Sequence, residues 1–467
     1  MTTTNPKKKK ICIIGAGLAG LTTGALLTQK GYPVEIFEKE PFIGGRAHSF
    51  TGDSLTLDQY QQLLTKFHMN LPFSEPSIET IFENNMLQGY TLDLGYHLIG
   101  GGVVSNLSHI LSSLQTHIDI LGSRLGYIQQ DGYQYPFLST MDKIRMSPQI
   151  LRLFFASDST MQQLDQQTMT QTITKYGKGK MKLTLELFSR VITTVNNLDK
   201  ISSGETLRAQ KGLLRGSTPV GYPKNGLKNI SEILSRYITN NGGIIHLETP
   251  VQHIIINQEA AQGVTVNNQD LFFDTIISNI LVQDLFTIAP EKHFPTDYVH
   301  TLKTLEGTGS LCAYYSLKHL DEHIRGKSFL FIERNAGVDG NDAVGMIDCL
   351  TTAPGSMVSP PGHHLIQAYI ICTPDEAQNQ HTLHHLQEIL DTQLERIIPK
   401  YHSQLEWALY PAIWQLDGVA KTIDNIKPEI ETPIQNLYLI GDCVKAPGIG
   451  INCALNSAKI LTQKLLS

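Results

Sequence analysis

The sequence contains no run of about 18 consecutive apolar residues, the length at which a membrane-spanning helix becomes plausible. Its first ten residues lead into a short β-like run and not into the apolar centre of a signal peptide. Positive charge is not in excess, since 37 Lys and Arg stand against 43 Asp and Glu, and the basic run at residues 7–10 is too short to predict nucleic-acid binding. We therefore expect a cytoplasmic protein that is at most peripheral to a membrane and has no nucleic-acid partner.

Several catalytic and metal-binding patterns are absent as well. The six cysteines are scattered without CxxC spacing, so the sequence predicts neither a zinc site nor a disulfide framework, and a reducing compartment is the simplest environment. No Ser-His-Asp order, HExxH motif or P-loop stands out. We therefore predict no metal site, and the catalytic residues stay unassigned.

The N-terminus carries the pattern of a βαβ unit. Residues 11–15 form a short apolar run that predicts a strand, residues 18–31 suit a helix that ends at a glycine, and residues 34–38 predict a second strand. The turn between the first strand and the helix is rich in glycine. We assign this turn to the binding of a dinucleotide: Gly15, Ala16, Gly17, Leu18, Ala19 and Gly20.

Each glycine of this fingerprint meets a steric requirement. Gly15 permits the tight turn, Gly17 lets the backbone approach a pyrophosphate, and Gly20 lets the helix pack closely on the strand. The helix N-terminus offers free N–H groups and the positive end of its dipole to the same diphosphate. Glu38 can accept hydrogen bonds from ribose hydroxyls and would repel a 2′-phosphate, and we include the adjacent Lys39 in the predicted site.

A second glycine motif follows Glu38 closely. Gly44 and Gly45 allow close approach of the backbone, and Arg46 supplies a cation suited to phosphate. With these motifs the sequence resembles the FAD-dependent amine oxidase and phytoene desaturase superfamily, in which such a motif follows the dinucleotide fingerprint and lies along the flavin. The resemblance implies FAD as the cofactor. Because the SGGC-type attachment site of covalent amine oxidases is missing, we expect noncovalent FAD.

The resemblance extends to the C-terminus. Residues 436–442 are similar to a family motif whose acidic residue binds the ribityl or diphosphate portion of FAD. The turn at 448–452 is similar to one that leads into a helix whose N-terminus faces the flavin pyrimidine, and the strand at 251–256 opens where family members contact the adenine through a valine backbone. The resemblance therefore adds five residues to the predicted site: Val251, Gly441, Asp442, Gly450 and Ile451.

Two further blocks are similar to the family. Residues 93–97 are similar to a block beside the isoalloxazine, and residues 222–226 to a turn before a helix, with asparagine in place of the commoner glycine. For His97 two roles stay open, a proton-handling group near the flavin or a packed side chain that hydrogen-bonds to the backbone. Trp407 and Trp414 similarly fit either a substrate pocket or the core.

The predicted fold is α/β: a discontinuous Rossmann-like, glutathione-reductase-type FAD-binding domain with an inserted mixed α+β substrate domain and a helical cap. Three segments are expected to form the FAD-binding domain, namely 1–105 with an inserted helix at about 52–88, 219–288 and 426–467. Between them we expect a helical substrate or cap region at 106–218 and the mixed sheet of the substrate domain at 289–425.

The C-terminal block is more similar to phytoene desaturase-like and protoporphyrinogen oxidase-like members than to amine oxidases. We therefore expect an FAD-dependent oxidoreductase that desaturates, oxidises or redox-isomerises a small lipophilic substrate such as a polyene, an isoprenoid or a tetrapyrrole. A flavin amine oxidase and a non-catalytic FAD-binding scaffold or regulator stay open as alternatives. The electron acceptor is open between oxygen, a quinone and NAD(P), because no second fingerprint opens a nicotinamide domain.

Overall fold

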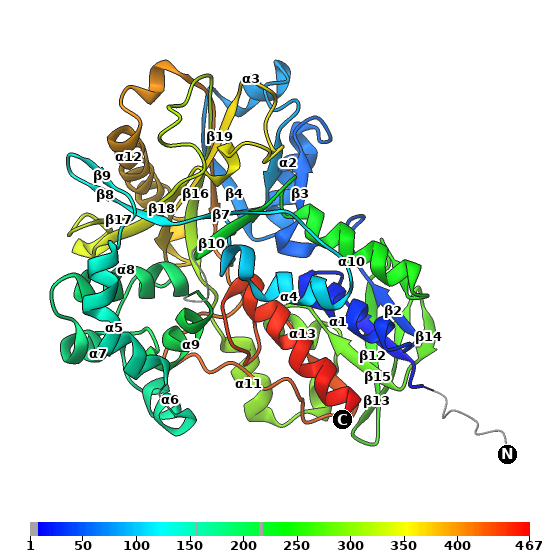
Figure 1. Ribbon diagram of the computed structural model, residues 1–467. Helices are drawn as coiled ribbons and strands as arrows, with labels where there is room; N and C mark the ends of the chain where they lie inside the picture. Colours follow the sequence, from blue (N-terminus) through cyan, green and yellow to red (C-terminus); the bar gives the residue numbers. More distant parts are fainter. Residues whose placement is uncertain (1–7, 156, 214–217) are drawn as a thin grey trace.

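The computed structural model describes residues 8–155, 157–213 and 218–467, so Lys7, at the start of the basic run, lies outside the described residues. Its first layer is a five-stranded parallel sheet with the order β11-β2-β1-β15-β21 (Figure 1). Strand β1 and strand β15 are buried at every position, because strands at the centre of a parallel sheet are covered on both faces. The strands are β1 (Ile11–Ile14), β2 (Val34–Phe37), β11 (Ile244–His246), β15 (Thr275–Ser278) and β21 (Leu437–Leu439).

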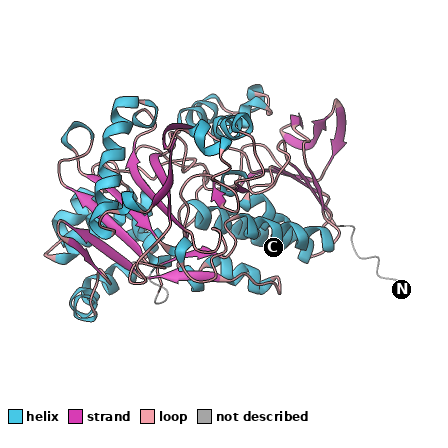
Figure 2. Cartoon of the chain, turned by 90° about the horizontal axis from the view of Figure 1, so that it is seen from above, coloured by secondary structure: helices cyan, strands magenta, loops and turns pink. Residues whose placement is uncertain are grey.

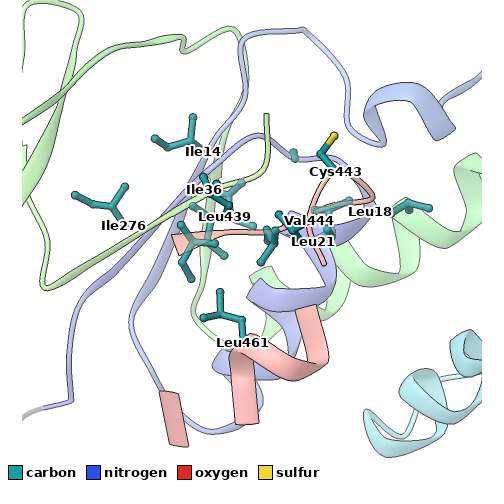
Figure 3. Packing of buried hydrophobic residues seen from close by; sticks show 14 of the residues in the cluster. Ile14, Leu18, Leu21, Ile36, Ile276, Leu439, Cys443, Val444 and Leu461 are labelled. Carbon is teal, nitrogen blue, oxygen red and sulfur yellow. The ribbon is translucent and has the colours of Figure 1, made fainter. Parts of the chain in front are cut away.

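Helices cover this sheet and complete its core. Helix α1 (Leu18–Gln29) packs against α10 (Lys228–Asn240) and α13 (Gly450–Leu466), and it is buried on almost all sides. Figure 3 shows the resulting core, to which strands, helices and the loop after β21 all contribute side chains. The labelled members are Ile14, Leu18, Leu21, Ile36, Ile276, Leu439, Cys443, Val444 and Leu461.

Three smaller sheets are attached to this unit. The antiparallel sheet of β12 (Val251–Asn257), β13 (Ala260–Val266) and β14 (Gln269–Phe272) lies at the end of the molecule near the N-terminus (Figure 2). The other two combine segments that are distant in sequence. They are β6 (Ile99–Gly100), β10 (Val220–Pro223) and β7 (Ile120–Ser123), in that order, and the pair of β3 (Ser49–Thr51) with β5 (Thr91–Asp93).

The second large layer is an eight-stranded mixed sheet with the order β4-β20-β16-β19-β18-β17-β8-β9. Helix α12 (Gln380–Ile397) covers one face, and the other face packs against β3, β5 and the helix between them in a second apolar core. Its strands are β4 (Met69–Glu75), β8 (Leu125–Gln129), β9 (Gly132–Gln134), β16 (Gly309–Leu317), β17 (Ser328–Glu333), β18 (Ala343–Asp348), β19 (His364–Cys372) and β20 (Leu405–Ile413).

The remaining helices lie around these two layers. Helices α5 to α9 gather into one lobe, at the lower left of Figure 1, which we call the helical lobe. Its members are α5 (Thr140–Phe154), α6 (Asp158–Asp165), α7 (Met169–Tyr176), α8 (Lys180–Thr193) and α9 (Ser203–Leu213). The others are α2 (Leu57–Lys66), α3 (Ile78–Glu83), α4 (Asn106–Ser113) and α11 (Thr296–Thr304).

The α/β fold with a discontinuous Rossmann-like domain and a mixed second sheet is confirmed, and the structure adds detail to two segments. The stretch at 52–88, expected to be an inserted helix, also supplies edge strand β4, and the stretch at 106–218, expected to be helical, supplies β7, β8 and β9. Short strands at sheet edges have weak local signals, because their pairing depends on distant partners. Within the described ranges, no helix is long and apolar enough to cross a bilayer.

Candidate functional site

A cavity of about 460 Å³ opens where the parallel sheet meets the second layer. Four of its lining residues, Gly15, Glu38, Asn279 and Ile440, directly follow strands β1, β2, β15 and β21. The carboxyl ends of parallel strands lie at one edge, which is where open α/β sheets bind ligands. Other lining residues come from the turn between α2 and β4 and from the segment after β20, so the cavity lies between the two layers.

At one end of this cavity, the glycine fingerprint presents backbone without side chains, with Gly15 and Gly17 among the lining residues. The Gly15 N–H donates to the Phe37 carbonyl over 2.8 Å, which closes the turn between β1 and α1. A Cβ at Gly17 would lie 2.9 Å from Asn279 Nδ2, and a Cβ at Gly20 would lie 2.2 Å from the Gly15 carbonyl oxygen. Side chains are therefore excluded at both positions, and the N-terminus of α1 is left open to the cavity.

Glu38 is held rigidly at the end of β2. Its Oε2 accepts the Ala16 N–H at 2.7 Å and its Oε1 accepts the Glu40 N–H at 3.0 Å. Burial raises the pKa of the Glu38 carboxyl, and these two backbone donors oppose that rise. A buried carboxyl with fixed orientation beside the helix N-terminus is suited to bind ribose hydroxyls.

The centre of the cavity contains an ion pair between the two ends of the chain. The Arg46 guanidinium lies 2.5 Å from Asp442 Oδ1 and also donates to the Leu416 carbonyl at 3.0 Å. Asp442 Oδ2 accepts the Gly418 N–H at 2.8 Å. Burial acts to raise the pKa of Asp442, but the Arg46 charge outweighs it and holds that pKa well below its usual range. Asp442 is therefore ionised, and it orients Arg46 toward the cavity.

Two further ionisable side chains, Lys427 and Asp417, lie next to the Arg46–Asp442 pair. Lys427 Nζ donates to the Asp442 carbonyl, and Asp417 Oδ2 accepts the Thr194 hydroxyl at 3.1 Å. Burial raises the pKa of Asp417, and repulsion from Asp442 raises it further. Neither Lys427 nor Asp417 was predicted from the sequence, although a lysine and an aspartate-glycine pair close to the C-terminal motif were visible signals.

The C-terminal motif is positioned by the first turns of α13. Gly441 donates its N–H to Ser457 Oγ at 2.9 Å, which ties the turn after β21 to the helix. Asn452 Nδ2 donates to the Gly100 carbonyl at 2.9 Å. Gly450 and Ile451 line the cavity at the helix N-terminus, where free N–H groups favour negative charge.

His97 marks the side of the cavity that faces the second layer. It also lines a small adjoining cavity of about 10 Å³, with Phe67, Met69 and Ile413 among the walls. Its Nδ1 is buried and has no hydrogen-bond partner among the described residues. Burial, reinforced by the Arg46 charge, lowers the pKa of His97 to about 4, so the imidazole is neutral near pH 7.

The sequence profile of the family described as flavin containing amine oxidoreductase matches residues 18–466. The chain belongs to this family. It is 25% identical over 312 residues to a 4,4'-diapophytoene desaturase (4,4'-diapolycopene-forming) of Methylomonas sp, a match that covers 58% of this chain and only 53% of that enzyme. It is 22% identical to the 1-hydroxycarotenoid 3,4-desaturase of Flavobacterium sp. (strain P99-3) over 97% of this chain and 98% of that enzyme.

Solved structures share the fold of this flavin family member. An oxidoreductase from Methanosarcina mazei superposes with a TM-score of 0.72 at 19% identity, covering 97% of this chain and all of that one. A putrescine oxidase superposes with a TM-score of 0.64 at 12% identity, covering 98% of this chain and 99% of the oxidase. At these identities the likeness establishes the fold alone. The resemblance and the prediction of FAD as cofactor are confirmed by the family match together with this fold.

The cavity of this flavin family member fits an FAD. The bare backbone at Gly17 and Gly45 leaves room for a diphosphate, Glu38 lies at the ribose end, and the unpartnered His97 Nδ1 lies at the opposite, apolar side. Of the predicted site residues, all but Ala16 and Gly20 line the cavity. Those two residues support the lining residues: the Ala16 N–H donates to Glu38, and Gly20 packs against the Gly15 carbonyl oxygen.

Some residues line the cavity that the motifs did not indicate. Among them are Asn279, which directly follows β15, and a group near the turn between α2 and β4. The position of Asn279 after a short β-branched strand was a usable signal, whereas the others approach only through tertiary packing. The group consists of Lys66, Phe67 and His68, with Asp284 nearby.

Other predicted blocks support the site from outside the cavity. Asp93 accepts hydrogen bonds from Ser49 Oγ and Tyr222 Oη, both at 2.5 Å, and so joins β3, β5 and β10. Trp407 is fully buried in the core of the second layer, and Trp414 packs edge-on against His68. Neither tryptophan lines the cavity, so the structure places them in packing positions.

Proposed function

We propose that the protein is an FAD-dependent oxidoreductase that desaturates, oxidises or redox-isomerises a lipophilic substrate such as a polyene, an isoprenoid or a tetrapyrrole. The observation that carries the proposal is the cavity itself, which has charged and bare-backbone groups at one end and apolar walls with a neutral histidine at the other. The matched relatives named as desaturases of carotenoid compounds support the choice of substrate class.

The proposed division of labour follows from the residues. Glu38 binds the ribose, and the N-terminus of α1 with Gly44 and Gly45 binds the diphosphate. Arg46, held by Asp442, contacts the portion of FAD between diphosphate and flavin, and Val251 contacts the adenine. When bound, FAD supplies a two-electron acceptor. Gly450 and Ile451 at the start of α13 favour negative charge beside it.

On the apolar side the chain mainly orients the substrate and excludes water. His97 is the titratable group placed there, and its imidazole lines both the main and the adjoining cavity. A neutral imidazole can accept a proton at one ring nitrogen. The electron acceptor is oxygen, a quinone or NAD(P), and we further propose a cytoplasmic location with peripheral membrane contact, because a lipophilic substrate partitions into bilayers.

The first test is to measure the cofactor and its reduction. We expect absorbance at about 350 to 500 nm, release of about one FAD per chain on denaturation, and anaerobic bleaching by a polyene or tetrapyrrole. Bleaching by amines alone would favour the amine oxidase alternative. Bound FAD that neither class bleaches would favour the scaffold alternative, and folded protein that cannot take up added FAD would overturn the proposal.

A matched pair of variants tests the site. Glu38→Gln should weaken FAD binding, because the ribose loses a charged acceptor, whereas Glu35→Gln should not. Glu35 lies on the same strand β2 but pairs with Lys10 at 2.8 Å and does not line the cavity. Equal FAD affinity in the two variants would contradict the assignment of Glu38.

A further inference from the structure

Helix α5 has apolar side chains on two different faces. Met146 points inward and is buried in the core of the helical lobe. Met141, Ile144 and Leu151, by contrast, are 55%, 60% and 51% exposed, and Pro148 between them is also exposed. At about 100° per residue, these four positions fall within about 80° of one another on the helix. We call them the α5 stripe.

The α5 stripe differs from three other strongly exposed apolar side chains. Phe272, Met357 and Ile426 are each 63% exposed, but they lie on three unrelated segments. Exposed apolar residues that are scattered singly need no explanation, whereas a continuous stripe indicates an interaction surface. A helix that buries one apolar face in its own lobe and presents a second one to solvent is suited to a second apolar environment.

The charge around the α5 stripe indicates what that environment is. Residues 139–182 contain seven Lys and Arg against three Asp, a net charge of +4, while the whole chain carries −6. Lys143 and Arg145 on α5 are exposed, and neither forms an ion pair with any described residue. The one acidic residue of α5, Asp142, is already paired with Lys180 at 3.0 Å.

The positive charge beside the α5 stripe comes from the helix itself. At about 100° per residue, Arg145 lies about 40° around the helix from Met141, and Lys143 lies about 80° from Leu151. Lys180 contacts Asp142, which lies toward the inward-facing side of Met146, so the segment around Lys180 does not border the stripe. The stripe is therefore bordered by the uncompensated positive charge of Lys143 and Arg145, which is complementary to anionic phospholipid headgroups.

We propose that α5 is a docking helix for an anionic phospholipid bilayer, on which it lies parallel to the surface with Met141, Ile144 and Leu151 inserted among the acyl chains. A second copy of the chain fits the stripe less well, because stable protein interfaces bury about 800 Å² on each partner and four side chains in one row offer far less. The positive border would also repel its own copy.

The helical lobe connects this surface to the cofactor cavity. Thr194, at the end of α8, donates to Asp417, whose neighbour Gly418 donates to Asp442 in the cavity. Lys421 Nζ on the same loop pairs with Glu205 of α9 at 2.8 Å. The lobe that carries α5 is therefore linked by hydrogen bonds and an ion pair to the loop that contacts Asp442. The proposal rests on the peripheral membrane contact proposed above but not on the reaction, so it can fail while the proposed FAD-dependent reaction stands.

The test is sedimentation of the full-length protein with vesicles. We expect binding to vesicles of phosphatidylcholine with about 30% phosphatidylglycerol, and binding at least about tenfold weaker to pure phosphatidylcholine. The variant Met141→Ser/Ile144→Ser/Leu151→Ser should lose about tenfold or more in binding to the anionic vesicles. Lys143→Glu/Arg145→Glu should lose a similar factor, and the loss should shrink at high salt.

A matched control removes the same number of exposed apolar side chains elsewhere. Phe272→Ser/Met357→Ser/Ile426→Ser should bind the anionic vesicles like the unchanged protein. Flavin content and unfolding temperature, measured on every variant, verify that each one is folded. Equal vesicle binding by the stripe variant and the unchanged protein would overturn the proposal. So would a dimer in light scattering that the stripe variant alone converts to a monomer, because a second copy would then cover the stripe.

Discussion

Buried carboxyl groups differ between the cofactor cavity and the eight-stranded sheet. In the cavity, Arg46 stands beside Asp442 and holds its pKa well below the usual range, so that a full negative charge persists although the site is buried. In the sheet, Asp348 is equally buried but has only Ser328 and a backbone N–H as partners, and burial raises its pKa to about 7. The same buried side chain type therefore has a lowered pKa at Asp442 and a raised pKa at Asp348, and the difference is the cation beside Asp442.

The same contrast extends to the backbone. The cavity is built from glycine turns in which a Cβ would collide with neighbouring backbone or with Asn279. The sheet is built from long strands with nearly complete burial, such as β16 and β19. The cofactor site keeps unfilled space and the paired charges of Arg46 and Asp442, whereas the sheet fills its space and leaves Asp348 without a cation and with a raised pKa.

The largest expected effect comes from adding a side chain at Gly20, in the glycine-rich turn between β1 and α1. Gly20→Ala places a Cβ 2.2 Å from the Gly15 carbonyl oxygen, which forces α1 away from β1. We expect loss of FAD retention and a decrease of about 3 kcal/mol or more in the free energy of unfolding. Flavin absorbance and urea unfolding measure both. Gly242→Asn is the control, since nothing lies near its Cβ position and asparagine tolerates the left-handed backbone there.

Removing the Arg46 cation should leave Asp442, like Asp348 in the sheet, as a buried carboxyl without an arginine beside it. Arg46→Met leaves Asp442 buried without its counter-charge, and we expect a loss of about 2 to 3 kcal/mol in the free energy of unfolding, together with weaker FAD binding. Adding Asp442→Asn to this variant should restore some of the stability, because the uncompensated charge is gone. Strictly additive effects in this double-mutant cycle would contradict the coupling.

Replacing Asp348 in the eight-stranded sheet should remove one contribution to the pH dependence of the free energy of unfolding. The folded pKa of Asp348 lies above its ordinary value of 3.8, at about 7, so this group destabilises the fold increasingly as the pH rises from about 4 to 7. Asp348→Asn removes that penalty and keeps the acceptor for Ser328. We expect the variant to gain about 2 kcal/mol relative to the unchanged protein between pH 5 and pH 8, measured by urea unfolding. A constant difference across this range would refute the assignment.

The smallest expected effect concerns His97, whose contribution to the stability changes with pH in the opposite direction to that of Asp348. The folded pKa of His97 is lowered to about 4 from its ordinary 6.5, so its contribution is complete above pH 6.5 and is lost as the pH falls toward 4. The stability of His97→Gln relative to the unchanged protein should therefore be greater at pH 5 than at pH 7, by about 1.8 kcal/mol. Urea unfolding at the two pH values measures this. A pH-independent difference would indicate that His97 is exposed or paired in solution.

The local motifs were sufficient for much of the cofactor site. The turn at Gly15 to Gly20 and the acid Glu38 have their geometry set by short-range sterics, so their spacing indicated where a dinucleotide would bind. The block that ends at Asp442 was added by the family resemblance. The charged groups behind them were not predictable in this way. Lys427 and Asp417 reach Asp442 through loops whose course depends on the packing of the whole second layer.

The βαβ unit, the glycine turns and a dinucleotide site could be predicted from the residues alone, because each depends on backbone conformations and spacings within a few tens of residues. FAD as the cofactor was implied by the family resemblance. Three-dimensional packing was needed to establish that Arg46 pairs with Asp442, that Asn279 packs against the glycines of the fingerprint, and that a buried His97 lines the cavity. It was also needed to show that the segment after α2 joins the second sheet as β4. Most of these contacts join residues hundreds of positions apart, and they form only because apolar burial brings the two layers together.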